Sequence, residues 1–219
     1  MKFDLHVHTN ASMDGIVPPK KLVELARKRV DGIAITDHNT MKGWEQVRHV
    51  KDFHIIPGME IKIKEEGKTI GDILALFLKE EVKSRSLYEV IDEIRSQDGI
   101  IAVAHPFRSK KPFLMIDEIR EKIDAIEVFN ARCLNDEENE TALNYAKKND
   151  LAFVAGSDAH TPWEIGRAYT TADVSDIQEL RKAIKKKQTL FKGRRSHSSI
   201  HLVSPIAKTN KKIRALLPI

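Results

Sequence analysis

The sequence has one cysteine and no long apolar run, and each of these features excludes certain classes of protein. Its single cysteine, Cys133, excludes a framework of internal disulfides and any zinc site built from several thiolates. The longest apolar run, residues 73–78, is far too short to span a bilayer, and the first residues contain no apolar targeting stretch. We therefore expect a cytoplasmic protein with no membrane partner.

Acidic residues are absent from the C-terminal part of the chain. Residues 181–219 contain 12 Lys or Arg and no Asp or Glu, whereas residues 1–180 contain 25 basic and 32 acidic residues. This asymmetry indicates either an anionic partner such as nucleic acid or a solvated basic tail lying on an acidic body, and solvated charge runs are the commoner case. We predict one domain over residues 1–193, followed by a basic extension over residues 194–219.

Apolar segments rich in β-branched residues alternate with amphipathic stretches of helical spacing, such as residues 18–30 and 86–97. The apolar segments are residues 3–8, 32–36, 53–56, 70–78, 100–104, 125–129 and 151–155. Strands that alternate with helices predict an α/β fold of parallel units, arranged as a barrel or as a doubly wound sheet.

Two histidines lie in the first of these segments. The residues alternate strictly between polar and apolar, so a strand would place His6 and His8 on one face with Leu5 and Val7 packed behind them. Two adjacent imidazoles supply two ligands of a metal site, although a pair of this spacing on its own is common outside such sites.

Further potential ligands follow four of the later apolar segments. In α/β barrels and open parallel sheets, the carboxyl ends of the strands are where active sites are built. Five strand ends with the same arrangement are difficult to explain by packing alone. The residues concerned are Asp37, His38, Glu60, His105, Asp158 and His160.

This mixture of imidazoles and carboxylates without thiolate suits Zn²⁺, Mn²⁺ or Fe²⁺. The number of ligands exceeds the need of one tetrahedral ion, so we expect a cluster of two or three divalent metals. Such clusters suit the hydrolysis of phosphate esters. Arg108, Arg132 and Arg167 also lie just past strand ends, where guanidinium groups could bind the phosphate oxygens of a substrate.

Five motifs, taken in order, resemble those of the PHP family, named for polymerase and histidinol phosphatase. They are Asp-Leu-His-Val-His-Thr at 4–9, Thr-Asp-His-Asn at 36–39, Gly-Met-Glu-Ile at 58–61, Ala-His-Pro-Phe at 104–107 and Ser-Asp-Ala-His at 157–160. The resemblance covers residues 3 to about 167. It implies a distorted seven-stranded β/α (TIM-like) barrel with a trinuclear metal cleft at the carboxyl ends of its strands.

The resemblance also implies a set of ligands for each metal. The first metal would take His6, His8, Glu60 and Asp158, and the second would take Glu60 and His105. The third would take Asp14, His38 and His160.

The sequence departs from the family pattern at one position. Many members carry a histidine that binds the second metal where this chain has Asp72. A carboxylate is a good ligand for Mn²⁺ or Fe²⁺, so we include Asp72 among the expected ligands.

The expected function is that of a metal-dependent phosphoesterase with a metal-bridging hydroxide as nucleophile. Glu60 and Asp158 would hold the metals, Asp37 would orient ligands from behind, and Arg108 would stabilise phosphoryl charge. The short stand-alone members of the family that this chain resembles act on nucleotide 3′,5′-bisphosphates and on the 5′ ends of short RNAs. The alternatives are a phosphatase of small metabolites such as histidinol phosphate and a non-catalytic nucleic-acid-binding protein with a structural metal cluster.

Overall fold

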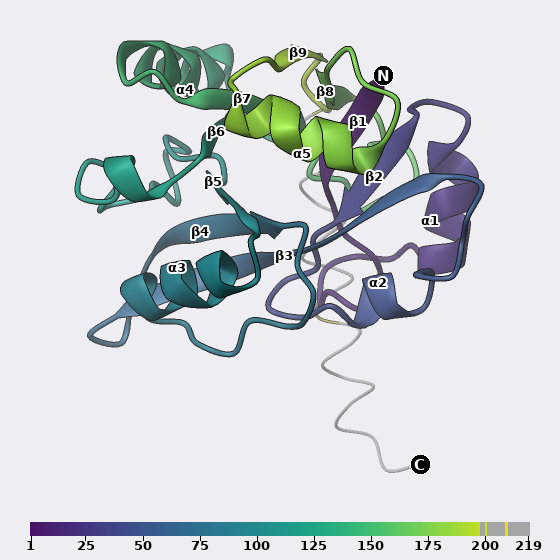
Figure 1. The fold of residues 1–219 in the computed structure, drawn as a ribbon, viewed down its shortest axis with the longest axis horizontal. Coiled ribbons are helices and arrows are strands. Elements are labelled where there is room, and N and C mark those ends of the chain that lie inside the picture. Colours follow the sequence, from purple (N-terminus) through teal and green to yellow (C-terminus); the bar gives the residue numbers. More distant parts are fainter. Residues whose placement is uncertain (198–199, 201–208, 210–219) are drawn as a thin grey trace.

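The computed structural model describes residues 1–197, 200 and 209 (Figure 1). Within these residues the chain forms nine strands, five α-helices and one short 3-10 helix, η1 (Arg120–Lys122). The strands are β1 (Lys2–Val7), β2 (Gly32–Ile35), β3 (His54–Glu65), β4 (Lys68–Leu76), β5 (Ile100–Val103), β6 (Ala125–Asn130), β7 (Ala152–Gly156), β8 (Ala168–Thr171) and β9 (Leu190–Gly193). The helices are α1 (Pro19–Ala26), α2 (Lys42–Glu45), α3 (Leu87–Ser96), α4 (Asp136–Lys148) and α5 (Ile177–Lys185).

Strands β1 to β8 follow one another around a closed barrel, because β8 also pairs with β1. Strand β9 is added to the outside of this ring through β8. The pairs β1–β2, β2–β3, β5–β6 and β6–β7 are parallel, whereas β3–β4, β4–β5, β7–β8 and β8–β1 are antiparallel. The predicted α/β barrel is therefore confirmed, but the predicted count of seven strands was wrong. Strand β8 was missed because Ala-Tyr-Thr-Thr is too short and too polar to stand out as an apolar segment.

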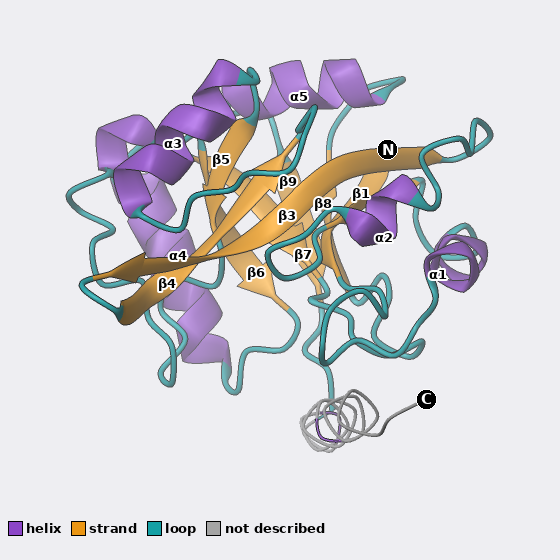
Figure 2. Ribbon diagram, turned by 90° about the horizontal axis from the view of Figure 1, so that it is seen from below, coloured by secondary structure: helices purple, strands orange, loops and turns teal. Residues whose placement is uncertain are grey.

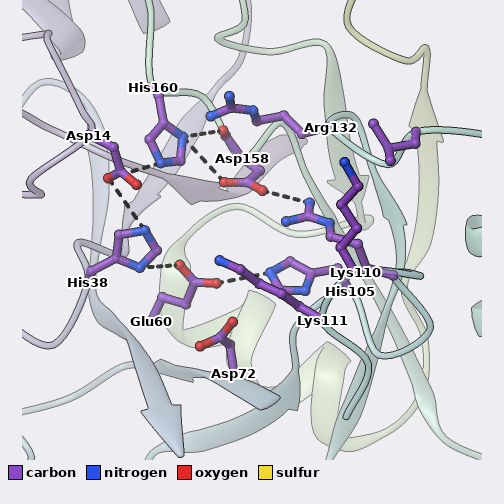
Figure 3. A pocket seen from close by; sticks show the side chains of 12 residues that line it. Asp14, His38, Glu60, Asp72, His105, Lys110, Lys111, Arg132, Asp158 and His160 are labelled. Carbon is purple, nitrogen blue, oxygen red and sulfur yellow. Dashed lines mark hydrogen bonds and ion pairs between the residues drawn. The ribbon is translucent and has the colours of Figure 1, made fainter. Parts of the chain in front are cut away.

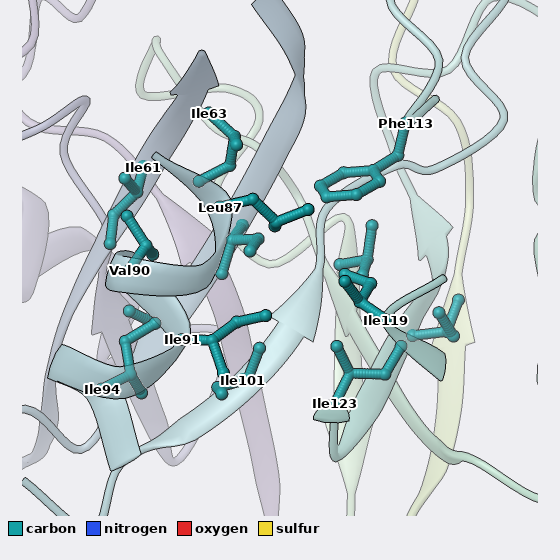
Figure 4. Packing of buried hydrophobic residues seen from close by; sticks show 14 of the residues in the cluster. Ile61, Ile63, Leu87, Val90, Ile91, Ile94, Ile101, Phe113, Ile119 and Ile123 are labelled. Atoms are coloured by element: carbon teal, nitrogen blue, oxygen red, sulfur yellow. The ribbon is translucent and has the colours of Figure 1, made fainter. Parts of the chain in front are cut away.

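The alternation of side chains along β4 separates the inside of the barrel from the outside. Leu74 and Leu76 belong to a cluster with residues from β1, β2, β3, β5, β6, β7 and α5, so this cluster fills the barrel. Ile73 and Ala75 belong to a second cluster, which packs against α3 and α4 on the outside (Figure 4). Figure 2 shows the helices arranged around the strands in this way.

Strand β1 changes its inward face partway along. Phe3 and Leu5 belong to the inner cluster, whereas Val7 packs outside with residues of α1. The register of β1 against β2 shifts between Asp4 and Val7, which is the effect of an extra residue in one strand. The expected strict alternation, with Leu5 and Val7 side by side behind the histidines, was therefore wrong. The irregularity is what lets His6 face inward immediately after Leu5.

The segment after β9 remains attached to the barrel for a few residues. The backbone N–H of Arg194 donates to Arg167 O at 2.9 Å, and that of Ser196 donates to Ala131 O at 2.6 Å. The predicted domain boundary between residues 193 and 194 stays a prediction, and most of the predicted basic extension lies outside the described residues. Within the described part of the chain, no helix combines the length and the apolar character needed to cross a membrane.

Candidate metal and phosphate site

A cavity of about 250 Å³ opens at one end of the barrel. Its walls differ in chemistry, since histidines and carboxylates form one side and basic side chains form the other (Figure 3). Twelve residues line it: Asp14, His38, Glu60, Asp72, His105, Arg108, Lys110, Lys111, Arg132, Leu134, Asp158 and His160. Most of the residues singled out in the sequence are thus brought to one place.

The ligand candidates come from strands and from the segments that follow them. His38, His105 and Asp158 follow β2, β5 and β7, as predicted for the carboxyl ends of barrel strands. Glu60 differs, because β3 continues to Glu65 and Glu60 therefore lies within the strand rather than past its end. The apolar segment at 53–56 showed only the part of β3 that pairs in parallel with β2; the rest forms a long antiparallel hairpin with β4.

The deepest group contains His6, His8 and Asp158, whose ligand atoms lie within 4.8 Å of one another. The Nε2 atoms of His6 and His8 are 3.0 Å apart, and His8 Nε2 lies 3.3 Å from Asp158 Oδ1. His8 Nε2 is also 3.3 Å from Glu60 Oε2. Both rings are completely buried beneath the cavity.

A second group consists of Glu60, Asp72 and His105. His105 Nε2 lies 3.0 Å from Glu60 Oε1, so Glu60 uses one oxygen here and the other toward His8. Asp72 is 4% exposed, and its Oδ1 atom is buried without a hydrogen-bond partner. The structure therefore places Asp72 in the cluster, although its role as a ligand stays a prediction.

A third group contains His8, His38 and His160. Asp14 Oδ1 bridges two of these rings, at 3.5 Å from His38 Nε2 and 3.3 Å from His160 Nε2. On its other side, His38 Nδ1 lies 2.7 Å from Glu60 Oε2. The three groups thus form one continuous cluster, with Glu60 at its centre (Figure 3).

Three of the rings are oriented by acceptors behind them. His6 Nδ1 donates to Glu127 Oε1 at 2.9 Å, and His160 Nδ1 donates to the Asp158 carbonyl at 2.8 Å. His8 Nδ1 lies 3.1 Å from Ser12 Oγ, whose own proton is donated to Asp37 at 2.7 Å. Because each Nδ1 carries the proton, each Nε2 can present its lone pair to the cluster, as metal-binding histidines do.

The donor set fits divalent cations. Three carboxylate oxygens of the cluster are buried without a hydrogen bond: Asp14 Oδ1, Glu60 Oε2 and Asp72 Oδ1. The first two lie beside imidazole nitrogens only. Buried carboxylates this close together are costly unless positive charge lies among them. We therefore infer a site for divalent metal ions.

The electrostatics of the cluster also favour positive charge. Burial lowers the pKa of His8 to about 3, helped by the neighbouring rings of His160 and His38, so this ring is neutral. Burial would also lower the pKa of His38, but Glu60 and Asp14 outweigh it and raise the pKa to about 10. The pKa of Glu60 stays well below its usual range, because the rings of His38 and His6 outweigh the burial of the carboxylate.

Backbone geometry at the strand ends turns two ligands into the site. His105 has a φ of +30° and Asp158 a φ of +53°, both in a region that residues other than glycine rarely adopt. Gly156, just before this turn, lies against β1. A Cβ there would come within 2.3 Å of His6 Cβ, so only glycine permits β7 to approach His6 this closely.

Asp37 and Glu127 support the ligands from behind. Asp37 accepts from Thr9 N at 2.7 Å and from Ser12 N at 3.2 Å, in addition to the Ser12 hydroxyl, so it anchors the loop that holds His8 and does not reach the cavity. Glu127 accepts from His6 through one oxygen and from His105 N at 2.8 Å through the other. Both carboxylates hold histidines of the cluster in place.

The basic wall contains two of the three predicted arginines. Arg108 donates to Asp158 Oδ2 at 2.9 Å, and Arg132 lies 3.2 Å from Glu164 Oε1. Arg167 does not line the cavity, because its guanidinium donates to the carbonyls of Trp163 and Arg195, each at 3.3 Å. The structure thus argues against Arg167 as a substrate-binding residue, and we omit it from the proposed site.

Four residues of the site were missed in the sequence. Lys110 and Lys111 reach over the cavity in Figure 3, but lysines in a polar loop resemble ordinary surface residues. Glu127 offered a clue, since it is an acid inside an apolar segment that was expected to be a strand. Glu164 is completely buried and accepts from His160 N at 3.0 Å, and no spacing marked it.

Comparison with known proteins adds three relatives. The chain is 38% identical over 187 residues to an uncharacterised protein of Methanocaldococcus jannaschii, covering 82% of this chain and 73% of the relative. It is 30% identical over 103 residues to a 5′-3′ exoribonuclease of Haemophilus influenzae, covering 45% of this chain and 37% of that enzyme. Among solved structures it resembles a two-domain protein of Bacteroides vulgatus containing a predicted PHP-like metal-dependent phosphoesterase, with a TM-score of 0.72 and 19% identity.

That structural match covers 89% of this chain, and the chain spans 65% of the Bacteroides protein. A family model described as PHP-associated matches residues 136–189, from the start of α4 to just before β9. A closed barrel with a cluster of histidines and carboxylates at one end defines a metal-binding α/β barrel. Within that class, the chain belongs to the PHP family.

Proposed function

We propose that this protein hydrolyses phosphate esters of nucleotides or of short RNAs with the help of two or three divalent metal ions, Mn²⁺, Zn²⁺ or Fe²⁺. The observation that carries the proposal is the opposition of two walls in one cavity. Ligands for cations line one side, and side chains that attract anions gather on the other; the two meet where Arg108 contacts Asp158. A phosphate group held between them would be in contact with both.

The metal ligands in this proposal are those that the structure brings together. They are His6, His8, Asp14, His38, Glu60, Asp72, His105, Asp158 and His160. Divalent metals bound there would supply the activation of water and the polarisation of a phosphoryl oxygen. Glu60 reaches toward His8, His38 and His105, so one carboxylate contacts residues of all three groups of the cluster.

The protein's own contribution to charge stabilisation comes from the opposite wall. Asp158 raises the pKa of the half-buried Arg108 above its ordinary value against the effect of burial, so this side chain stays cationic. Arg108 contacts Asp158 directly, which places its charge beside the ligands. We infer that Arg108 and Arg132 bind the phosphoryl oxygens and stabilise the charge that develops on them.

Three features support a nucleotide or short RNA as the substrate. Four basic residues line the cavity, and this is more positive charge than one monoanionic group requires. The side chains of Lys110 and Lys111 are exposed and have no ion pair or hydrogen bond among the described residues, so they remain available to an anion. One relative is a 5′-3′ exoribonuclease.

A substrate screen with Mn²⁺-loaded protein tests this proposal. We expect a nucleotide 3′,5′-bisphosphate or a short 5′-phosphorylated RNA to be hydrolysed with a kcat/KM at least about tenfold above that of histidinol phosphate or a sugar phosphate. A preference for histidinol phosphate would instead make the protein a phosphatase of small metabolites. Absence of turnover on every phosphoester would leave a nucleic-acid-binding protein with a structural metal cluster.

A further inference from the structure

The basic wall of the cavity is carried by two irregular segments. Residues 105–112 follow β5 and contain Arg108, Lys110 and Lys111, and residues 131–135 join β6 to α4 and contain Arg132. Neither segment lies in a helix or a strand. Their mutual position therefore depends on side-chain contacts rather than on the sheet.

One buried carboxylate contacts both segments. Glu138 lies in the first turn of α4 and is 6% exposed. Its Oε1 atom accepts hydrogen bonds from Ser109 N at 2.9 Å and from Ser109 Oγ at 2.6 Å. Its Oε2 atom accepts from Leu134 N at 3.0 Å. Each oxygen thus holds a different segment. Oε1 binds Ser109, which is next to Arg108, and Oε2 binds Leu134, which is two residues from Arg132.

The neighbouring residue completes the connection to the site. Asn139 Oδ1 accepts from Asn130 N at 2.9 Å, at the end of β6. Asn130 Oδ1 in turn accepts from Arg108 Nη2 at 2.8 Å and from Arg132 N at 2.9 Å. The first turn of α4 therefore reaches both arginines, through Glu138 on one side and through Asn139 on the other.

The charge of Glu138 suits this position. Burial by itself would raise its pKa, but the hydrogen bonds from Ser109 and Leu134 hold the pKa below its ordinary value. The carboxylate is therefore ionised at neutral pH and accepts bonds through both oxygens. The first turn of a helix also stabilises negative charge.

We propose that Glu138 is a positioning residue that sets the spacing of the basic wall and thereby the affinity of the cavity for phosphate. This inference depends on one part of the proposed function, namely that the basic wall binds a phosphate group. Glu138 lines no part of the cavity, so it acts through Arg108, Arg132 and the two lysines.

The test compares Glu138→Gln with Glu137→Gln in the Mn²⁺-loaded protein. A glutamine keeps the shape of the side chain but has one acceptor oxygen, so it releases one of the two segments. Glu137 is exposed in the same helical turn and serves as the matched control for the loss of charge. The readouts are the Kd of inorganic phosphate by calorimetry, KM and kcat for an aryl phosphate, and bound Mn²⁺.

We expect Glu138→Gln to raise the Kd of phosphate and the KM by about tenfold, with kcat changed less than about threefold and bound Mn²⁺ unchanged. In an Arg108→Ala background the same substitution should add little, because the two residues act through one another. Glu137→Gln should change none of these values.

An unchanged Kd and KM in folded Glu138→Gln would overturn the proposal, as would equal effects of the two glutamine variants. If Glu138→Gln does not fold, Ser109→Ala serves instead, because it removes only the hydrogen bond from the Ser109 hydroxyl. An unchanged Kd of phosphate in Ser109→Ala would then contradict the proposal. Phosphate binding is measured without turnover, so this outcome is independent of whether the protein hydrolyses nucleotides.

Discussion

At the scale of residues, two features shape the proposed metal cluster. Glu60 is shared by neighbouring groups of ligands, and the histidines are held in one tautomer by the acceptors behind them. The residue that departs from the family pattern, Asp72, lies in the cluster with a buried oxygen that has no hydrogen-bond donor. An anionic oxygen at this position favours Mn²⁺ or Fe²⁺ over softer ions.

Replacing Asp72 tests whether it is a ligand. Asp72→Ala should lose about one metal ion per chain and most of the turnover, because the remaining members of its group, Glu60 and His105, do not fill a coordination sphere. Asp72→His restores the residue common in the family and should retain the metal. Metal analysis and aryl phosphate turnover measure both effects. Unchanged metal content in the alanine variant would show that Asp72 is not a ligand.

Glu127 offers a second test at this scale, because it accepts hydrogen bonds from both His6 and His105. Glu127→Gln should weaken metal affinity or turnover by about 10- to 100-fold, the usual cost of losing the partner of a metal-binding histidine. Glu140→Gln, at an exposed position on α4, serves as the control. Metal titration followed by activity distinguishes this role from a packing role, which would lower only the unfolding temperature.

At the scale of elements, the sequence predicted the strands with strong apolar character and missed those without it. The segments at 32–36 and 100–104 match β2 and β5 closely, because buried parallel strands are continuously apolar. Strands β8 and β9 were missed, because they pair at the edge of the parallel region and carry polar or exposed residues. The shift in β1 was also beyond prediction, since it depends on the partner strand.

In the site, too, residues that depend on contacts between distant segments could not be predicted from the sequence. Most of the candidate ligands that the structure brings together could be singled out in the sequence, because they lie on or near recognisable strands; Asp14, in a loop, was named only through the family resemblance. The supports Glu138 and Glu164 could not be predicted, since each contacts a residue of another loop that only the fold brings near it, Ser109 for Glu138 and Arg132 for Glu164.

Helix α5 is connected to the turn after α3 through Asp98. Lys185 Nζ lies 2.7 Å from Asp98 Oδ1, and Arg181 pairs with the same carboxylate. The hydrogen bond from Lys185, followed by that from Arg181, lowers the pKa of Asp98 from 3.8 to about 2. A carboxylate with a depressed pKa in the folded state stabilises the fold above its ordinary pKa, and this contribution disappears as the pH falls toward 2.

Asp98→Asn should therefore lower the Tm slightly at pH 6, by less than about 4 °C, because the ion pair is exposed. Asparagine tolerates the positive φ of +58° at this position, so the backbone is not the cause. The difference from the wild type should shrink between about pH 4 and pH 2. Thermal melts across this range measure it, and a difference that grows toward low pH would contradict the assignment.

At the scale of the whole molecule, charge is divided between the body and the C-terminal part. Residues 1–180 carry a net charge of −7, and residues 181–219 carry +12. Part of the basic charge is paired with the body, as in the contacts of Arg181 and Lys185 with Asp98 and of Arg195 with Asp136.

Ending the chain at His197 tests the role of the basic residues beyond it and keeps the hydrogen bond from Ser196 to Ala131. If these residues bind RNA, the shortened protein should lose affinity for RNA and show a shallower dependence on salt, with aryl phosphate hydrolysis unchanged. RNA binding at several salt concentrations and turnover of the small substrate are the two measurements. An equal loss in both would assign the segment to the fold instead.

If the cluster around Glu60 holds the metals on which phosphoester hydrolysis depends, hydrolysis of an aryl phosphate must be lost on chelation and restored with the metal. We expect no turnover after chelation, recovery when Mn²⁺ is added, and no recovery in a folded His6→Ala or Asp158→Ala variant. Turnover that survives chelation, or normal recovery in both variants, would contradict this role of the cluster.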